Sequence, residues 1–135
     1  MTDAEEIAGR SALRSFAVQE SDLATALGSG DVPVLATPRL IAWMEAATVA
    51  AVAGALPASD TTVGTAVEID HVAASPLGAS VTVSATVQGV EGKALRFDCE
   101  AVQTHPDGSS TVIGHGSITR AIVDRERFQA RLGSS

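Results

Sequence analysis

The stretch IAWMEAATVAAVAGAL, residues 41–56, is apolar or small on every side of a helix except for one glutamate, Glu45. Ile41 lies one turn before this glutamate and Val49 one turn after it. A helix without a polar face is usually buried. The stretch therefore predicts a buried central helix, and it raises the question of why a carboxylate lies within it.

Signals on both sides of this stretch predict where the helix begins and ends. Thr37 is a residue type suited to the N-cap, and Pro38 suits the first helical position. Pro57 cannot continue a helix, so we expect the helix to end near Leu56. At ~1.5 Å per residue the predicted helix is roughly 27 Å long.

Most of the remaining sequence has the pattern of strands. In ASVTVSATVQ, valine and alanine alternate with polar residues, which is typical of a strand with one buried face. The predicted strands after the helix form an antiparallel meander and cover residues 61–70, 79–88, 93–104 and 110–123. Before the helix we expect a first strand or extended arm at 14–23 and a loop at 26–34, and a short polar helix at 124–132.

A sheet with one apolar face and an apolar helix bury each other most economically when the sheet wraps around the helix. This predicts an α+β fold of the hotdog type, a long apolar helix wrapped by an antiparallel sheet, in one domain over residues 1–135. One small sheet covers only one side of a helix. We therefore expect a second copy of the chain to cover more of it, giving a homodimer.

Composition excludes several classes of partner and site. The net charge is −7 and Lys93 is the single lysine, so nucleic acid and anionic membranes are poor partners. Cys99 is the single cysteine and the three histidines lack compact ligand spacing, so we expect no metal site. The acidic N-terminus lacks a leader pattern, and the uncharged stretch 46–59 is shorter than the ~20 residues of a membrane span. We expect a cytoplasmic protein.

A buried carboxylate requires a partner, and His71 is the best candidate for Glu45. Strand alternation in TAVEIDH puts His71 on the same face as Thr65 and Ile69, which is the face toward the helix. Simpler interpretations remain for each residue. Glu45 could lie at a solvated helix edge or in a structural ion pair, His71 could be bound by a backbone carbonyl, and Thr37 could serve only as N-cap.

Four arginines gather near the C-terminus: Arg120, Arg125, Arg127 and Arg131. Such a group most often forms a solvated face and less often a phosphate clamp. The sequence assigns none of them to a ligand.

Three stretches of the chain together resemble the fluoroacetyl-CoA thioesterase family of hotdog proteins. They are VLATPRLIAWMEAATVAAV, TVGTAVEIDHVAASPLGASVTVSATVQGVEGKALRF and IGHGSITRAIVDRERF, within residues 32–130. The most specific parts are the threonine eight residues before the helix glutamate, the VGT turn, and H-x-A-A-S-P-x-G 26 residues after the glutamate.

The resemblance implies a thioester hydrolase, an acyl-CoA thioesterase, with its site at a dimer interface and without metal or prosthetic group. Thr37, Glu45 and His71 match the family's catalytic trio, and Gly64 of VGT matches the glycine whose amide holds the thioester carbonyl. Glu45 would attack the thioester carbon or deprotonate a water, with His71 as acid or base. Thr37 fits less well, because eight helical residues span about 12 Å.

Two alternatives stay open: a hotdog hydratase-dehydratase and a non-catalytic module that binds acyl-CoA. The hydratase arrangement has an aspartate and a histidine near the start of the helix, and residues 37–41 contain neither. The family resemblance also implies bulky aromatic residues ahead of the threonine, which act as a lid. The matching segment 24–36 has no aromatic residue, so we expect an open pocket that accepts short acyl groups.

Overall fold

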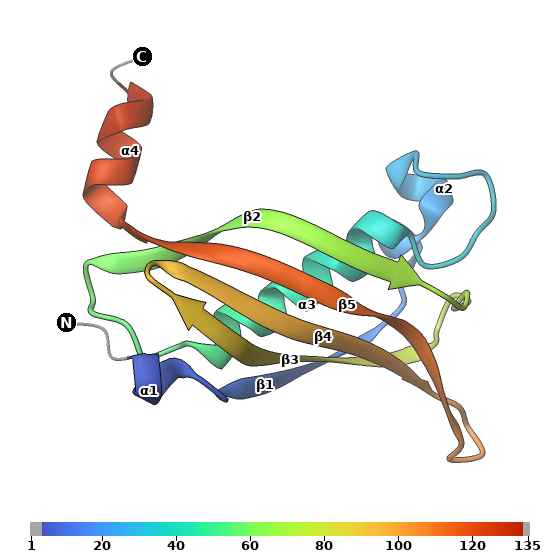
Figure 1. The fold of residues 1–135 in the computed structure, drawn as a ribbon. Helices are drawn as coiled ribbons and strands as arrows, with labels where there is room; N and C mark the ends of the chain where they lie inside the picture. Colours follow the sequence, from blue (N-terminus) through green and yellow to red (C-terminus); the bar gives the residue numbers. More distant parts are fainter. Residues whose placement is uncertain (1–3, 134–135) are drawn as a thin grey trace.

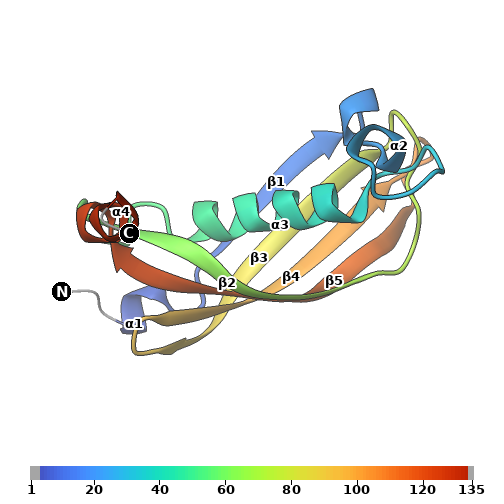
Figure 2. The same cartoon turned by 90° about the horizontal axis from the view of Figure 1, so that it is seen from above.

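The computed structural model describes residues 4–133, and its centre is the predicted long helix lying against a curved sheet (Figures 1 and 2). The helices are α1 (Ala4–Ile7), α2 (Ala24–Leu27), α3 (Thr37–Ala51) and α4 (Arg125–Gly133), with a 3₁₀ turn η1 at Glu20–Asp22. The strands are β1 (Ser11–Ala17), β2 (Asp60–His71), β3 (Ser80–Glu91), β4 (Ala94–Thr104) and β5 (Ser110–Asp124). This confirms the α+β hotdog architecture expected from the sequence.

The strands form one antiparallel sheet in the order β1-β3-β4-β5-β2. The predicted four-strand meander is therefore wrong in one respect: β2 pairs with β5 and not with β3. The strands that precede and follow α3 in the sequence, β1 and β2, thereby occupy the two edges of the sheet. In this order they flank the helix on both sides (Figure 2).

Helix α3 begins and ends differently from its prediction. Ala36 is the N-cap and makes no side-chain cap bond, while Thr37 is already helical and is followed by Pro38. The helix ends at Ala51, well before Pro57, and the chain turns at Gly54 with a positive φ of 77°. Arg10 covers this end from the N-terminal side of β1. Its Nε and Nη2 donate to the carbonyls of Ala51 and Ala53 at 2.9 and 3.0 Å.

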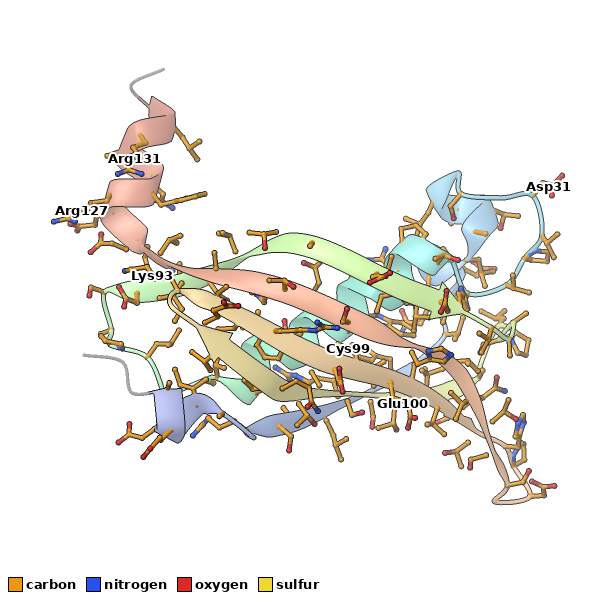
Figure 3. All side chains as sticks on the ribbon, viewed as in Figure 1. Asp31, Lys93, Cys99, Glu100, Arg127 and Arg131 are labelled. Atoms are coloured by element: carbon orange, nitrogen blue, oxygen red, sulfur yellow. The ribbon has the colours of Figure 1, made fainter. Side chains whose placement is uncertain are left out.

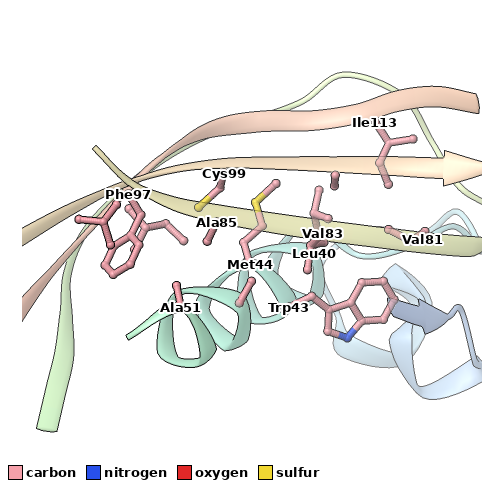
Figure 4. Packing of buried hydrophobic residues seen from close by; sticks show 14 of the residues in the cluster. Leu40, Trp43, Met44, Ala51, Val81, Val83, Ala85, Phe97, Cys99 and Ile113 are labelled. Carbon is pink, nitrogen blue, oxygen red and sulfur yellow. The ribbon is translucent and has the colours of Figure 1, made fainter. Parts of the chain in front are cut away.

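One side of α3 packs against the sheet as the alternation predicted. Leu40 and Met44 reach between the strands, and the Trp43 ring stacks on Phe16 of β1 with centroids 4.4 Å apart. Buried side chains of three strands form the surface on which the helix packs, and apart from Phe97 they are small or β-branched (Figure 4): Val81, Val83, Ala85, Phe97, Cys99 and Ile113.

The other side of α3 is not covered by its own chain. Ala42 is exposed, Val49 is 50% exposed, and the Glu45 side chain is 39% exposed. A single chain therefore covers only one side of the helix, as expected from one small sheet. Among residues 4–133 no helix is long and apolar enough to cross a membrane.

A β-bulge in β2 changes which residues face the helix. The register with β5 shifts between Gly64 and Ala66, so Thr65 is an extra residue in the strand. Strict alternation would put Gly64 and His71 on opposite faces. Because the bulge adds one residue, both lie on the face toward α3. The sequence predicted that Thr65 faces the helix, whereas in the structure Gly64 does.

Candidate active site

Thr37 and His71 form a hydrogen-bonded pair at the start of α3. The Thr37 Oγ1 lies 2.7 Å from the His71 Nδ1. The hydroxyl that the sequence assigned to helix capping is therefore engaged with a side chain from the end of β2. A neutral imidazole can accept the hydroxyl proton at Nδ1, so the pair has the composition of a nucleophile or water-orienting group with its base.

His71 is placed so that its imidazole stays neutral. Burial lowers its pKa below the usual value of 6.5, and interaction with the Ala73 backbone opposes this only in part. Its Nε2 is buried and has no hydrogen-bond partner among residues 4–133. The two ring nitrogens therefore differ: Nδ1 is hydrogen-bonded to Thr37, whereas Nε2 is buried and unpartnered within residues 4–133.

A cavity of about 340 Å³ adjoins this pair. Ser29, Gly30 and Val32, from the loop after α2, form one wall, and Thr37 and His71 form part of the other. Its volume lies at the small end of ligand pockets. No aromatic side chain lines it, as expected from the segment ahead of Thr37.

Glu45 lies two turns further along α3 and pairs with Arg120 of β5. The Arg120 Nη1 donates to the Glu45 Oε2 at 3.2 Å. His71 was the partner expected from the sequence, and this is corrected: within one chain His71 contacts Thr37, and Arg120 supplies the positive charge. The His71 end of β2 lies beside the start of α3, whereas Gly64, further back in β2, lies beside Glu45.

Gly64 provides the space for the carboxylate. A Cβ added to Gly64 would come within 2.8 Å of the Glu45 Oε2, closer than such contacts occur. The bulge at Thr65 brings this glycine onto the helix-facing side of β2. The residue that the family resemblance assigned to carbonyl binding therefore lies directly against the carboxylate.

Arg120 is the functional candidate that sequence reasoning missed. Its side chain is 9% exposed, whereas Arg127 and Arg131 lie on α4, away from the sheet (Figure 3). The four arginines therefore do not form one cluster. A signal was present in β5, where an arginine stands between Ile118 and Ile122 on the inward face. An arginine that faces the core requires an anion as partner. Glu45, the carboxylate of the apolar helix, was an anion for which the sequence had supplied no cation.

The described residues offer neither a cluster of metal ligands nor a reactive cysteine. Residues 4–133 contain no group of three or more His, Cys, Asp or Glu side chains that could hold a metal ion. Cys99 is buried on β4, and burial, with a smaller contribution from the charge of Asp98, raises the pKa of its thiol to about 12. A thiol that stays protonated is a poor nucleophile.

Comparison with solved structures identifies the class of protein: the fold is that of the hotdog thioesterases. The fluoroacetyl-CoA thioesterase FlK superposes with a TM-score of 0.84 at 30% identity, covering 95% of this chain and 96% of that one. A thioesterase superfamily member from Thermus thermophilus superposes with a TM-score of 0.83 at 25% identity, covering 94% and 90%.

Sequence comparison then gives the family. The chain belongs to the fluoroacetyl-CoA-specific thioesterase family, whose family model matches residues 18–126. The fluoroacetyl-CoA thioesterase of Streptantibioticus cattleyicolor is 38% identical over 99 residues, which are 73% of this chain and 68% of that protein. Thr37, Glu45, Gly64, His71 and Arg120 all fall within the matched range.

Proposed function

We propose that this protein is an acyl-CoA thioesterase that hydrolyses short-chain acyl thioesters, with Glu45 as nucleophile or general base. The observation that carries this proposal is the state of the Glu45 carboxylate. Arg120 holds one of its oxygens, while the side chain remains 39% exposed on an otherwise apolar helix. The carboxylate thus combines a charge partner with an open side from which a reactant can approach.

The neighbouring groups supply what thioester hydrolysis needs besides a nucleophile. The reaction needs donors for the developing oxyanion and a proton for the departing thiolate. In this proposal backbone N–H groups at Gly64 serve as the oxyanion donors, because the glycine lies against the Glu45 carboxylate. The Thr37–His71 pair moves the proton, with the neutral imidazole acting first as a base.

The distance between these groups supports a homodimer as part of the proposal. Thr37 and Glu45 are separated by about 12 Å along the helix axis, and no contact joins the Thr37–His71 pair to Glu45 among the interactions of residues 4–133. The uncovered side of α3 carries Glu45 and Val49, and β2 is an edge strand. A second chain on this side would cover the helix and could bring its own Thr37–His71 pair toward Glu45.

The test is a panel of short acyl-CoA thioesters, with release of free CoA thiol measured for each. We expect turnover on acetyl-CoA and its short homologues and slower turnover as the acyl chain outgrows the 340 Å³ cavity. Tight acyl-CoA binding without thiol release would identify a non-catalytic binding module. Addition of water to an enoyl-CoA would identify a hydratase. The cytoplasmic location expected from the sequence remains a prediction.

A further inference from the structure

Arg120 is held by more than its carboxylate partner. Its Nε donates to the Thr62 Oγ1 at 2.9 Å, and its Nη2 donates to the Thr62 carbonyl at 3.0 Å. Both bonds join β5 to β2, the strand that also carries Gly64. A guanidinium is planar and presents its N–H groups in a rigid fork. Two bonds to one residue therefore fix the plane of the Arg120 side chain and the direction of Nη1.

That fixed direction leads to Glu45. Within residues 4–133 the Nη1 has one hydrogen-bond partner, the Oε2 of Glu45 at 3.2 Å, and this oxygen lies 2.8 Å from where a Cβ on Gly64 would be. The other oxygen, Oε1, makes no hydrogen bond within residues 4–133. The contacts thus hold the carboxylate at one oxygen and leave the second one available.

We propose that Thr62 and Arg120 are positioning residues for the reaction of Glu45, with Thr62 acting only through Arg120. The inference rests on the proposed function, because it assigns to both residues the task of aiming a reacting carboxylate. Within residues 4–133 no hydrogen bond joins Thr62 to Glu45, and both residues bond Arg120. Thr62 sets the guanidinium plane, and the guanidinium sets the carboxylate.

The decisive variant is Thr62→Val, which removes the Oγ1 acceptor and keeps the side-chain shape and the backbone carbonyl. We expect kcat to fall by about 10-fold with KM nearly unchanged, since misplacing a reacting group by a fraction of an ångström costs rate rather than substrate affinity. Thr61→Val is the matched control, because the adjacent side chain points to the opposite face of β2. A wild-type kcat in Thr62→Val would overturn the proposal.

Chemical rescue separates positioning from structural support. Arg120→Ala should lose activity by about 100-fold, and guanidinium at low millimolar concentration, far below denaturing levels, should restore part of kcat. Arg120→Lys should retain less activity than the rescued alanine variant, because an ammonium cannot bond Thr62 and Glu45 as a fork. Melting temperatures are recorded for each variant. A loss of rate that follows the loss of folded protein, without rescue, would contradict the proposal.

A substrate-independent measurement keeps this inference distinct from the proposed function. The Arg120 Nε–H resonance, identified by its absence in Arg120→Lys, should exchange slowly with water in the wild type and faster in Thr62→Val. If no acyl-CoA is hydrolysed while this resonance behaves as expected, the proposed function is wrong although the contacts are real. If the wild type is active and Thr62→Val is equally active, the function stands and the positioning role is wrong.

Discussion

At the scale of single residues, the question raised by Glu45 has a specific answer. The glutamate is not buried alone, because Arg120 reaches it from β5, and it is only partly covered by its own chain. The sequence identified Glu45 because it is the single charge in the apolar stretch 41–56, and it identified His71 from strand alternation. It did not show which residues pair, because the Glu45–Arg120 and Thr37–His71 pairs depend on where β2 and β5 lie along α3. The inward position of Arg120 in β5 was the one signal that pointed to its pairing.

Glu45→Gln tests the proposed role of the carboxylate. We expect hydrolysis to fall by at least ~100-fold, the usual scale for losing an acid–base group. The fold should survive with a loss of about 1–2 kcal/mol, because the amide oxygen can still accept from Arg120 although the charge attraction is gone. Initial rates and urea unfolding measure the two effects. Glu68→Gln, on the exposed face of β2, is the control, and near-wild-type turnover of Glu45→Gln would end the proposed mechanism.

His71 should make folding stability depend on pH. Well above pH 6.5 the imidazole is neutral in both the folded and the unfolded chain, so it adds no pH dependence there. Below this pH the unfolded chain takes up a proton that the folded chain resists, because burial lowers the pKa of His71. The wild type should therefore lose stability between pH 7 and pH 5.

The measurement is urea unfolding at several pH values for the wild type and for His71→Gln. The variant should lose less stability on acidification than the wild type, and His115→Gln, which removes an exposed histidine of β5, is the matched control. Identical slopes for the wild type and His71→Gln would show that His71 titrates normally. The His71→Gln variant should also hydrolyse thioesters more slowly, though less severely than Glu45→Gln, because water can replace part of its role.

At the scale of elements, local patterns predicted most helices and strands within a few residues, and they failed where a distant contact decides. Helix α3 ends at Ala51, where Arg10, far away in sequence, donates to the carbonyls of Ala51 and Ala53. The bulge at Thr65 could not be predicted from the strand pattern either. In Val-Gly-Thr-Ala-Val the residues follow the two-residue alternation of a regular strand, although the observed register shifts between Gly64 and Ala66. That bulge, however, places Gly64 against Glu45.

Gly64→Ala tests the consequence of the bulge. The new Cβ would lie 2.8 Å from the Glu45 Oε2, so the carboxylate must move. We expect kcat to fall by about 10-fold or more, with a smaller effect on melting temperature because a glutamate side chain is flexible. Gly89→Ala is the matched control: it also lies at a register irregularity, in β3, and its added Cβ meets nothing within 4 Å. Equal rates for both variants would show that the contact has no functional role.

At the scale of the whole molecule, the prediction that concerns assembly is the homodimer. We expect light scattering to give twice the chain mass at micromolar concentration, because one sheet leaves the Glu45–Val49 side of α3 uncovered. Val49→Asp should shift the protein toward monomer and reduce hydrolysis. Val112→Asp, at a similarly exposed valine of β5 near the hairpin to β4, should do neither. A stable, active monomer would exclude both the dimer and a site completed by a second chain.

Substrate preference also belongs to this scale, because it depends on a loop, a helix and a strand together. The cavity beside Thr37 and His71 has no aromatic wall and opens along Gly30 and Ser29. We therefore expect weak or no preference for the fluorinated acyl group. The measurement compares kcat/KM for fluoroacetyl-CoA and acetyl-CoA, corrected for the greater reactivity of the fluorinated thioester. A residual preference above ~10³-fold would contradict this, since small pocket differences are worth about 1–3 kcal/mol.

The pairing of β2 with β5 also decides when the site can exist. Strands β3, β4 and β5 are joined by short turns. Strand β2, by contrast, cannot pair until β5, which starts at Ser110, is available. Glu45 and Arg120 are 75 residues apart, and Thr62 and Arg120 are 58 apart. Contacts across such loops form late in folding, and a chain still being synthesised cannot form them before β5 has emerged. A nascent chain that ends at Thr104 thus carries the carboxylate and the histidine but has no guanidinium to aim the carboxylate.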